Sequence, residues 1–120
     1  MTRITFYRRE GNFYGFKEVG HSGFADAGDD VLCAAISSMT MLVVNMIEVE
    51  FETDVQYLID DEKAIITVTA LGALPDYAED EKKQYAVSGV FKGYFDQLTD
   101  LAEEYYGYLE VDVKDDEDVV

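Results

Sequence analysis

The stretch RITFYRREGNFYGFKEV, residues 3–19, predicts two strands joined by a tight turn. Apolar and polar side chains alternate on both sides of Gly11, which occupies the turn position. Further along the chain, residues 53–60 and 63–70 form a second pair of strand candidates around a short connection. We therefore expect two β-hairpins, one near the N-terminus and one in the middle of the chain.

Two helices are predicted, one between the hairpins and one after them. The apolar run over about residues 30–48 predicts a long helix, with Asp29 or Asp30 as its N-cap candidate. Because this run is apolar on most faces, we expect other elements to cover it on several sides. Apolar residues recur at spacings of three and four over residues 79–106, which predicts an amphipathic helix that Gly107 would end.

A last segment, residues 108–113, alternates like a short edge strand. The order of hairpin, helix, hairpin, helix and strand predicts an α+β fold, with helices packed against a mainly antiparallel sheet. A chain of 120 residues that is 48% apolar is the right size and composition for one compact domain. We place that domain at residues 1–113 and interpret residues 114–120 as an acidic C-terminal tail.

Acidic residues outnumber basic ones by 26 to 9, so the formal net charge is −17. Such a charge repels phosphate backbones and anionic lipids, and we expect neither direct nucleic-acid binding nor membrane binding. It favours a basic partner, although solubility alone would also account for the acids.

The sequence also bears on compartment and cofactors. A single cysteine cannot form an internal disulfide, and the N-terminal residues lack the apolar core of a signal peptide, so we expect a cytoplasmic protein. The apolar run over residues 31–49 contains polar residues and lacks basic flanks, which favours a buried helix over a membrane span. The spacing of His, Cys and carboxylates matches no zinc or EF-hand pattern, so we predict no metal and no cofactor.

The only histidine and the only cysteine, His21 and Cys33, lie within twelve positions of each other. If a helix begins near Asp30, Cys33 lies in its first turn, where unpaired N–H groups favour a thiolate. A histidine within reach can take the thiol proton, which makes the pair a candidate for nucleophilic attack on a carbonyl. The alternative is a small buried cysteine and a structural histidine.

Neighbouring residues are candidates for supporting roles. Asp30 would cap the helix or orient His21. The alternative is that Asp30 is an ordinary N-cap with no part in catalysis. Its negative charge opposes formation of a thiolate at Cys33. Ser37 follows Cys33 by four residues and would either support the sulfur or only permit close packing. The N–H of Cys33, with one from the region of Gly20 or Gly28, would bind a developing oxyanion.

The ordering G-H-S…G-D-D-V-L-C-A-A-I-S resembles the ribosomal-processing cysteine protease family, also called Prp or YsxB-like proteins. The specific motif is confined to residues 20–37, whereas the order of hairpins and helices is similar to the small α+β fold of that family over most of the chain. Ser22 stands where the family usually has Ala, Leu32 stands where it usually has Val, and the C-terminus is more acidic. The positions that match the family pattern are Gly20, His21, Gly28, Asp30, Cys33, Ala34 and Ser37.

The resemblance implies that Cys33 is the nucleophile and His21 the general base of a cysteine endopeptidase. Its substrate would be the N-terminal extension of ribosomal protein L-twenty-seven, and the enzyme would be a homodimer. A very acidic protein suits such a basic client. The glycine-rich loop around residues 20–29 would act as a lid that orders when substrate binds.

Two other functions are compatible with the sequence. A non-catalytic acidic adaptor or ribosome-assembly factor would bind a basic protein and use Cys33 only for packing. A thioester or small-molecule acyl hydrolase would use the same pair of residues without a basic client.

Overall fold

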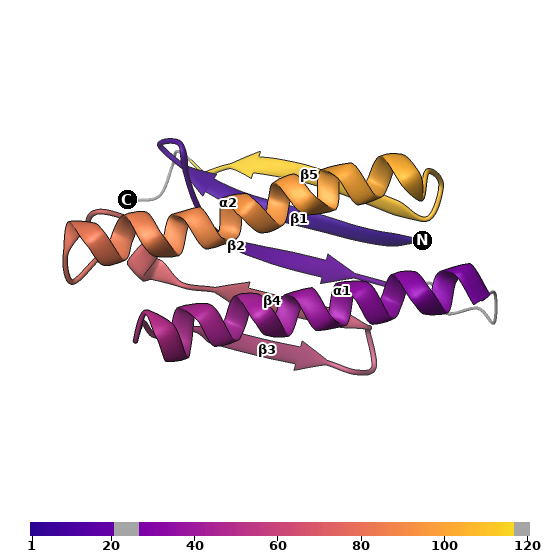
Figure 1. Ribbon diagram of the computed structural model, residues 1–120, viewed down its shortest axis with the longest axis horizontal. Coiled ribbons are helices and arrows are strands. Elements are labelled where there is room, and N and C mark those ends of the chain that lie inside the picture. The colour runs from indigo at the N-terminus through magenta and orange to yellow at the C-terminus, as the bar shows by residue number, and fades with distance from the viewer. Residues whose placement is uncertain (21–26, 117–120) are drawn as a thin grey trace.

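The structure is a computed structural model that describes residues 1–20 and 27–116. Within those ranges the chain forms a five-stranded sheet with two long helices on one face (Figure 1). The strands are β1 (Thr2–Arg9), β2 (Asn12–Val19), β3 (Gln56–Asp60), β4 (Ile65–Thr69) and β5 (Leu109–Asp115). The helices are α1 (Ala27–Asn45), which continues into the π-helical turn η1 (Met46–Glu50), the short 3-10 helix η2 (Leu71–Ala73), and α2 (Glu81–Glu104).

The sheet has the strand order β3-β4-β2-β1-β5 and is antiparallel except at one edge. The two predicted hairpins are present, and β2 of the first pairs with β4 of the second. Gly11 takes a φ of +82° at the tight turn between β1 and β2, a conformation that glycine adopts without strain. The last strand, β5, lies parallel to β1, with Ile4 opposite Val111. The α+β fold with a mainly antiparallel sheet is therefore confirmed.

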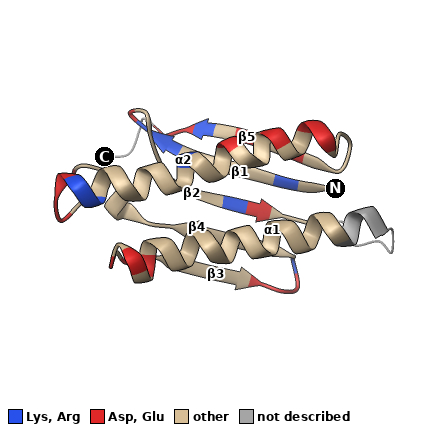
Figure 2. Ribbon diagram, viewed as in Figure 1, with Lys and Arg blue, Asp and Glu red and all other residues tan. Residues whose placement is uncertain are grey.

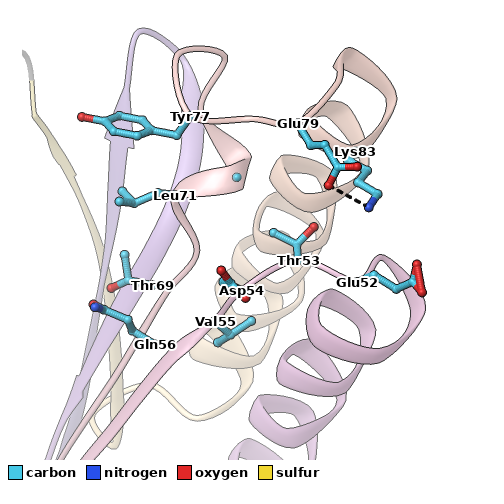
Figure 3. A pocket seen from close by; sticks show the side chains of 11 residues that line it. Glu52, Thr53, Asp54, Val55, Gln56, Thr69, Leu71, Tyr77, Glu79 and Lys83 are labelled. Carbon is cyan, nitrogen blue, oxygen red and sulfur yellow. Dashed lines mark hydrogen bonds and ion pairs between the residues drawn. The ribbon is translucent and has the colours of Figure 1, made fainter.

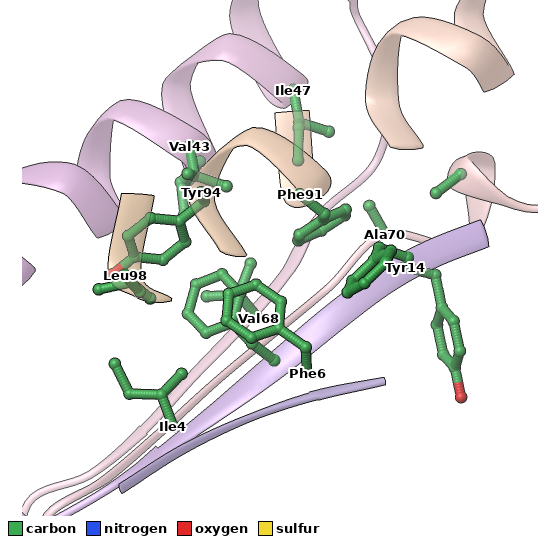
Figure 4. Packing of buried hydrophobic residues seen from close by; sticks show 14 of the residues in the cluster. Ile4, Phe6, Tyr14, Val43, Ile47, Val68, Ala70, Phe91, Tyr94 and Leu98 are labelled. Carbon is green, nitrogen blue, oxygen red and sulfur yellow. The ribbon is translucent and has the colours of Figure 1, made fainter. Parts of the chain in front are cut away.

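The core lies between the sheet and the helix layer (Figure 4). Phe6 of β1 and Phe16 of β2 are fully buried, with ring centroids 5.3 Å apart. The ring of Tyr94, from α2, packs edge-on against both of them. Burying side chains of this size contributes about 2–3 kcal/mol each to the free energy of unfolding, relative to leaving them exposed. This aromatic cluster therefore holds α2 against the hairpin of β1 and β2, the central hairpin of the sheet.

Helix α1 differs from its prediction in two ways. It begins at Ala27, about one turn earlier than expected, so Asp30 lies inside the first turn and is not the N-cap. It is also covered on one side only, since residues from Leu32 to Ile47 at spacings of three and four are buried, whereas Val31 and Leu42 remain 59% and 58% exposed. The expectation that other elements cover several sides of this helix is wrong for the described chain.

The segment Val31–Glu50 is the one helical stretch, within residues 1–20 and 27–116, that is long and apolar enough to cross a membrane. Length and composition alone also admit the core helix of a globular domain. Because its buried face, including Leu32, Ile36 and Val43, belongs to the same core as the sheet, we interpret it as such a helix.

Helix α2 matches its prediction closely, with each end two residues inside the expected range. The side chain of Asp80 accepts a hydrogen bond from the N–H of Lys83 at 2.8 Å, which caps the helix. Val87, Phe91 and Leu98 lie on its buried face, as their spacing predicted. Gly107, with a φ of +92°, follows the helix end and turns the chain into β5.

The C-terminal strand extends further than the sequence suggested. β5 reaches Asp115, whose carboxylate pairs with the guanidinium of Arg8 at 2.6 Å. Asp116 accepts hydrogen bonds from the hydroxyl of Tyr14 and the guanidinium of Arg9. Residues 114–116, expected in a solvated tail, are therefore attached to the central hairpin.

Candidate active site

Cys33 lies on α1 and is half-buried. The prediction that it occupies the first turn of the helix is wrong, because it follows the first helical residue, Ala27, by six positions. At that depth in an α-helix a backbone N–H bonds to the carbonyl four residues earlier, so the N–H of Cys33 is not a free oxyanion donor.

Gly20 is positioned by constraints that no other residue would meet without strain. Its φ is +74°, and a Cβ built on it would lie 2.9 Å from the carbonyl oxygen of Met1. Its N–H donates to the carbonyl of Ala64 at 2.9 Å. The chain is thus anchored at the residue that directly precedes His21.

His21 itself lies outside the described residues, as does most of the predicted lid. Gly28 and Asp30 are placed by their backbone in the first turn of α1, and the proposed contacts of the Asp30 side chain lie outside the described part of the structure. Ser37 is exposed one turn after Cys33.

A buried polar cluster that the sequence analysis missed lies between β2 and the two helices. The hydroxyl of Thr40 donates to the carboxyl of Glu18 at 2.5 Å and lies 2.9 Å from the hydroxyl of Tyr94. All three residues are at most 6% exposed. Burial raises the pKa of Glu18 to about 7, against the opposing effect of the hydrogen bonds from Thr40 and Tyr94.

The sequence carries a signal for this cluster. Glu18 follows the core residue Phe16 by two positions, so the period of a strand directs its carboxyl to the core. Thr40 follows Ile36 by four positions and therefore shares the buried face of α1. Polar residues at core positions need partners, and their pairing could have been inferred.

A polar pocket of about 550 Å³ lies between the N-terminal end of α2, the end of β4 and the segment that leads into β3 (Figure 3). The carboxylates of Glu52, Asp54 and Glu79 line it, and Glu79 pairs with Lys83 at 3.3 Å. It opens beyond the C-terminal end of α1, about 25 Å from Cys33 at the usual helical rise. The pocket is therefore separate from the thiol.

The described residues contain no group of three or more His, Cys, Asp or Glu side chains arranged to hold a metal ion. The chemistry that these residues support is that of a thiol carried on a helix.

Solved structures share this architecture. The chain is similar to the crystal structure of SMU.848 from Streptococcus mutans, with 26% identity, a TM-score of 0.79, and coverage of 97% of this chain and 96% of that one. It is also similar to the essential ribosomal processing protease Prp from S. aureus in complex with a covalently linked product peptide. That match has 18% identity, a TM-score of 0.75, and coverage of 95% of this chain and 100% of that one.

A second complex of S. aureus Prp, with a substrate peptide, matches at 16% identity and a TM-score of 0.76, covering 95% of this chain and 100% of that one. At these identities the two Prp complexes show a shared fold. No curated protein sequence matches the chain.

The fold is that of a small α+β domain with a half-buried cysteine on its first long helix, and the match to a cysteine protease family model defines the chain as a cysteine protease. The family model described as Cysteine protease Prp matches residues 1–110. The chain belongs to this Prp family, whose members act in ribosomal processing. The resemblance noted in the sequence is thereby confirmed.

Proposed function

We propose that this protein removes the N-terminal extension of ribosomal protein L-twenty-seven, with Cys33 as nucleophile and His21 as general base. One observation carries the assignment of the nucleophile: a member of a cysteine protease family requires a reactive cysteine, and this chain has a single one. Cys33 lies half-buried on α1, in a region that matches the family model.

The reaction proceeds through an acyl-enzyme. His21 accepts the thiol proton, and the sulfur of Cys33 attacks the peptide carbonyl. The C–N bond then breaks, and the leaving amine takes that proton from His21. A water molecule, deprotonated by His21, attacks the thioester, which releases the acid product and returns the proton to the thiol.

Charge supports a basic substrate. The formal net charge is −17, and Figure 2 shows acidic residues near the C-terminal end of α2 and around η1. A negative protein surface attracts a basic peptide over distances comparable to the screening length. The peptide complexes of S. aureus Prp support a peptide as the ligand, and the identity of the ribosomal protein rests on the family resemblance.

We also propose that the enzyme is a cytoplasmic homodimer. Apolar side chains on α1 and on the edge strand β3 support association with a second copy, because Leu42, Leu58 and Ile59 are each more than half exposed. An edge strand with exposed apolar residues is rarely left uncovered in a stable monomer.

The test is cleavage of a peptide that spans the junction of the extension and mature L-twenty-seven, followed by mass spectrometry. Wild-type protein should cleave at one bond, whereas Cys33→Ser should lose cleavage and still bind the peptide. His21→Ala should also lose cleavage, and Lys92→Ala, an exposed change on α2, is the control. Cleavage by Cys33→Ser would contradict the assignment of the nucleophile. Binding without cleavage by the wild type would favour the adaptor.

A further inference from the structure

The buried cluster of Glu18, Thr40 and Tyr94 connects three elements of the fold. Glu18 lies on β2, Thr40 on α1 and Tyr94 on α2, and their side chains are 6%, 2% and 5% exposed. Figure 4 shows the ring of Tyr94 directed from α2 into the space between the helices and the sheet. The hydroxyl of Tyr94 also lies 3.4 Å from the carbonyl oxygen of Ile36, on α1. Among the residues that the structure describes, the buried polar side chains are those of Thr2, Glu18 and Thr40, and two of these three belong to this cluster.

The cluster lies at similar distances from two positions that matter for the proposed chemistry. Cys33 precedes Thr40 by seven residues, which is close to two helical turns, or about 10 Å along α1 on nearly the same face. Gly20 follows Glu18 by two residues, or about 7 Å along an extended chain. β2 ends at the side of the molecule where α1 begins (Figure 1), so both displacements have the same direction.

We propose that Glu18, acting through Thr40 and Tyr94, is a positioning residue that holds α1 against β2 and so fixes the place of Cys33 relative to the end of that strand. The inference rests on the proposed function, since it takes Cys33 as the nucleophile and His21, which follows Gly20 in the chain, as the general base. Glu18 touches no reacting atom and acts only through the two elements that it joins.

The hydrogen bonds of the cluster can run in two directions, because each hydroxyl has one proton to donate. With Glu18 ionised, Tyr94 donates to Thr40 and Thr40 donates to the carboxylate. With Glu18 neutral, its carboxyl proton is donated to Thr40, Thr40 donates to Tyr94, and Tyr94 donates to the carbonyl of Ile36. Protonation of Glu18 therefore changes which contacts join β2 to α1.

Apart from Thr40 and Tyr94, the described residues that face Glu18 from the neighbouring strands are apolar. Ile4 of β1 and Ile66 of β4 are its register partners on the adjacent strands. α1 presents Thr40, and α2 presents Tyr94, the titratable group that faces Glu18 among the residues that the structure describes. Burial places the pKa of Glu18 near 7, within the range where a thiol protease is assayed.

The test compares Thr40→Ser with Thr40→Val in the peptide-cleavage assay. Ser keeps the hydroxyl and loses a methyl group, whereas Val keeps the shape and loses the hydroxyl. A positioning role predicts that Thr40→Val lowers kcat at least tenfold with KM changed less than twofold, and that Thr40→Ser stays within threefold of wild type. A packing role predicts the opposite order, which would overturn the proposal.

Glu18→Gln supplies the second readout. The rate at which iodoacetamide alkylates Cys33 is measured from pH 5 to pH 9 in wild type and variant. Beyond the pH dependence that the thiol and its proposed base give to both proteins, we expect wild type to show a component near pH 7 that Glu18→Gln lacks. The same profile in both proteins would overturn the proposal, whether or not the peptide substrate has been identified correctly.

Controls separate this inference from the proposed function. Tyr94→Phe should act like Thr40→Val, whereas Tyr14→Phe, which removes the hydroxyl of another buried tyrosine, should leave kcat unchanged because Tyr14 lies at the opposite end of β2. Circular dichroism confirms that each variant is folded. If Cys33→Ser retains cleavage, both proposals fail. If Cys33→Ser is inactive while Thr40→Val and Tyr94→Phe behave as wild type, only the positioning role fails.

Discussion

At the scale of single residues, Gly20 is the position that tolerates least change. Gly20→Ala would place a Cβ 2.9 Å from the oxygen of Met1 in a backbone conformation with φ of +74°. We expect a loss of about 1–3 kcal/mol in the free energy of unfolding, measured by urea denaturation, together with lower peptide cleavage.

Gly89→Ala is the matched control, because nothing lies within 4 Å of a Cβ at that position of α2. Alanine there should raise stability by up to about 1 kcal/mol, since glycine is a poor helix former. Equal effects of the two substitutions would show that the backbone at Gly20 is not constrained as described.

Glu18 makes stability depend on pH with a defined sign. Its pKa is about 7 in the folded protein and about 4.5 when the chain is unfolded, so between these values the folded state holds a proton that the unfolded state has lost. The free energy of unfolding therefore falls as pH rises from about 4.5 to 7, by an amount on the order of 3 kcal/mol.

Glu18→Gln should lack this component, so the difference in stability between variant and wild type should shift in favour of the variant as pH rises through that interval. Denaturant titrations at a series of pH values measure this difference. A constant difference across the interval would mean that Glu18 titrates normally in the folded protein.

The residues of the site show what the sequence could and could not predict. The family motif singled out Gly20, whose backbone is constrained as described, and Cys33, whose role stays a prediction. The buried position of Glu18 could have been inferred from strand periodicity and that of Thr40 from helix periodicity, whereas their contact with Tyr94 depends on how the two helices pack on the sheet, which spacing alone does not specify.

At the scale of elements, the N-cap of α2 can be tested directly. Asp80→Ala removes the acceptor for the N–H of Lys83 and should lower the free energy of unfolding by about 1 kcal/mol, measured by urea denaturation. Glu79→Ala, beside it, removes an exposed ion pair and should change stability by less than about 0.5 kcal/mol. A larger effect at Glu79 than at Asp80 would contradict this account of the helix start.

The two long helices were predicted with unequal success for a physical reason. α2 carries its apolar residues in one stripe, so its buried face and its ends follow from spacing and capping. α1 is apolar around much of its circumference, and its start was assigned to acidic residues that in fact lie within its first turn. Whether such a helix is covered on one side or on several depends on the partners available in the fold, which periodicity alone does not specify.

At the scale of the whole molecule, charge should control the encounter with a basic substrate. We expect kcat/KM for the L-twenty-seven peptide to fall as NaCl is added, because salt shortens the screening length to about 10 Å at 0.1 M. The formal net charge of −17 is the source of this effect. A matched peptide with its lysines and arginines replaced by glutamine should show a much weaker dependence, and equal salt dependence of both peptides would contradict electrostatic attraction.

Self-association can be tested on the same scale. Leu42→Asp places a charge on the exposed apolar face of α1 without entering the core. Sedimentation velocity should show a dimer for wild type and a monomer for the variant, with Lys92→Asp as a control on α2. A wild-type monomer at micromolar concentration would contradict the proposed homodimer.

The pairing of β1 with β5 also affects how the protein is made. Thr2 pairs with Leu109, so the β1 edge of the β1–β2 hairpin stays unpaired until the ribosome has synthesised β5, about a hundred residues later. Contacts with such a large sequence separation slow folding and leave intermediates with unpaired strand edges. During translation the hairpin therefore exists for most of the elongation time with its β1 edge open, and formation of the complete sheet is one of the last events in the synthesis of this domain.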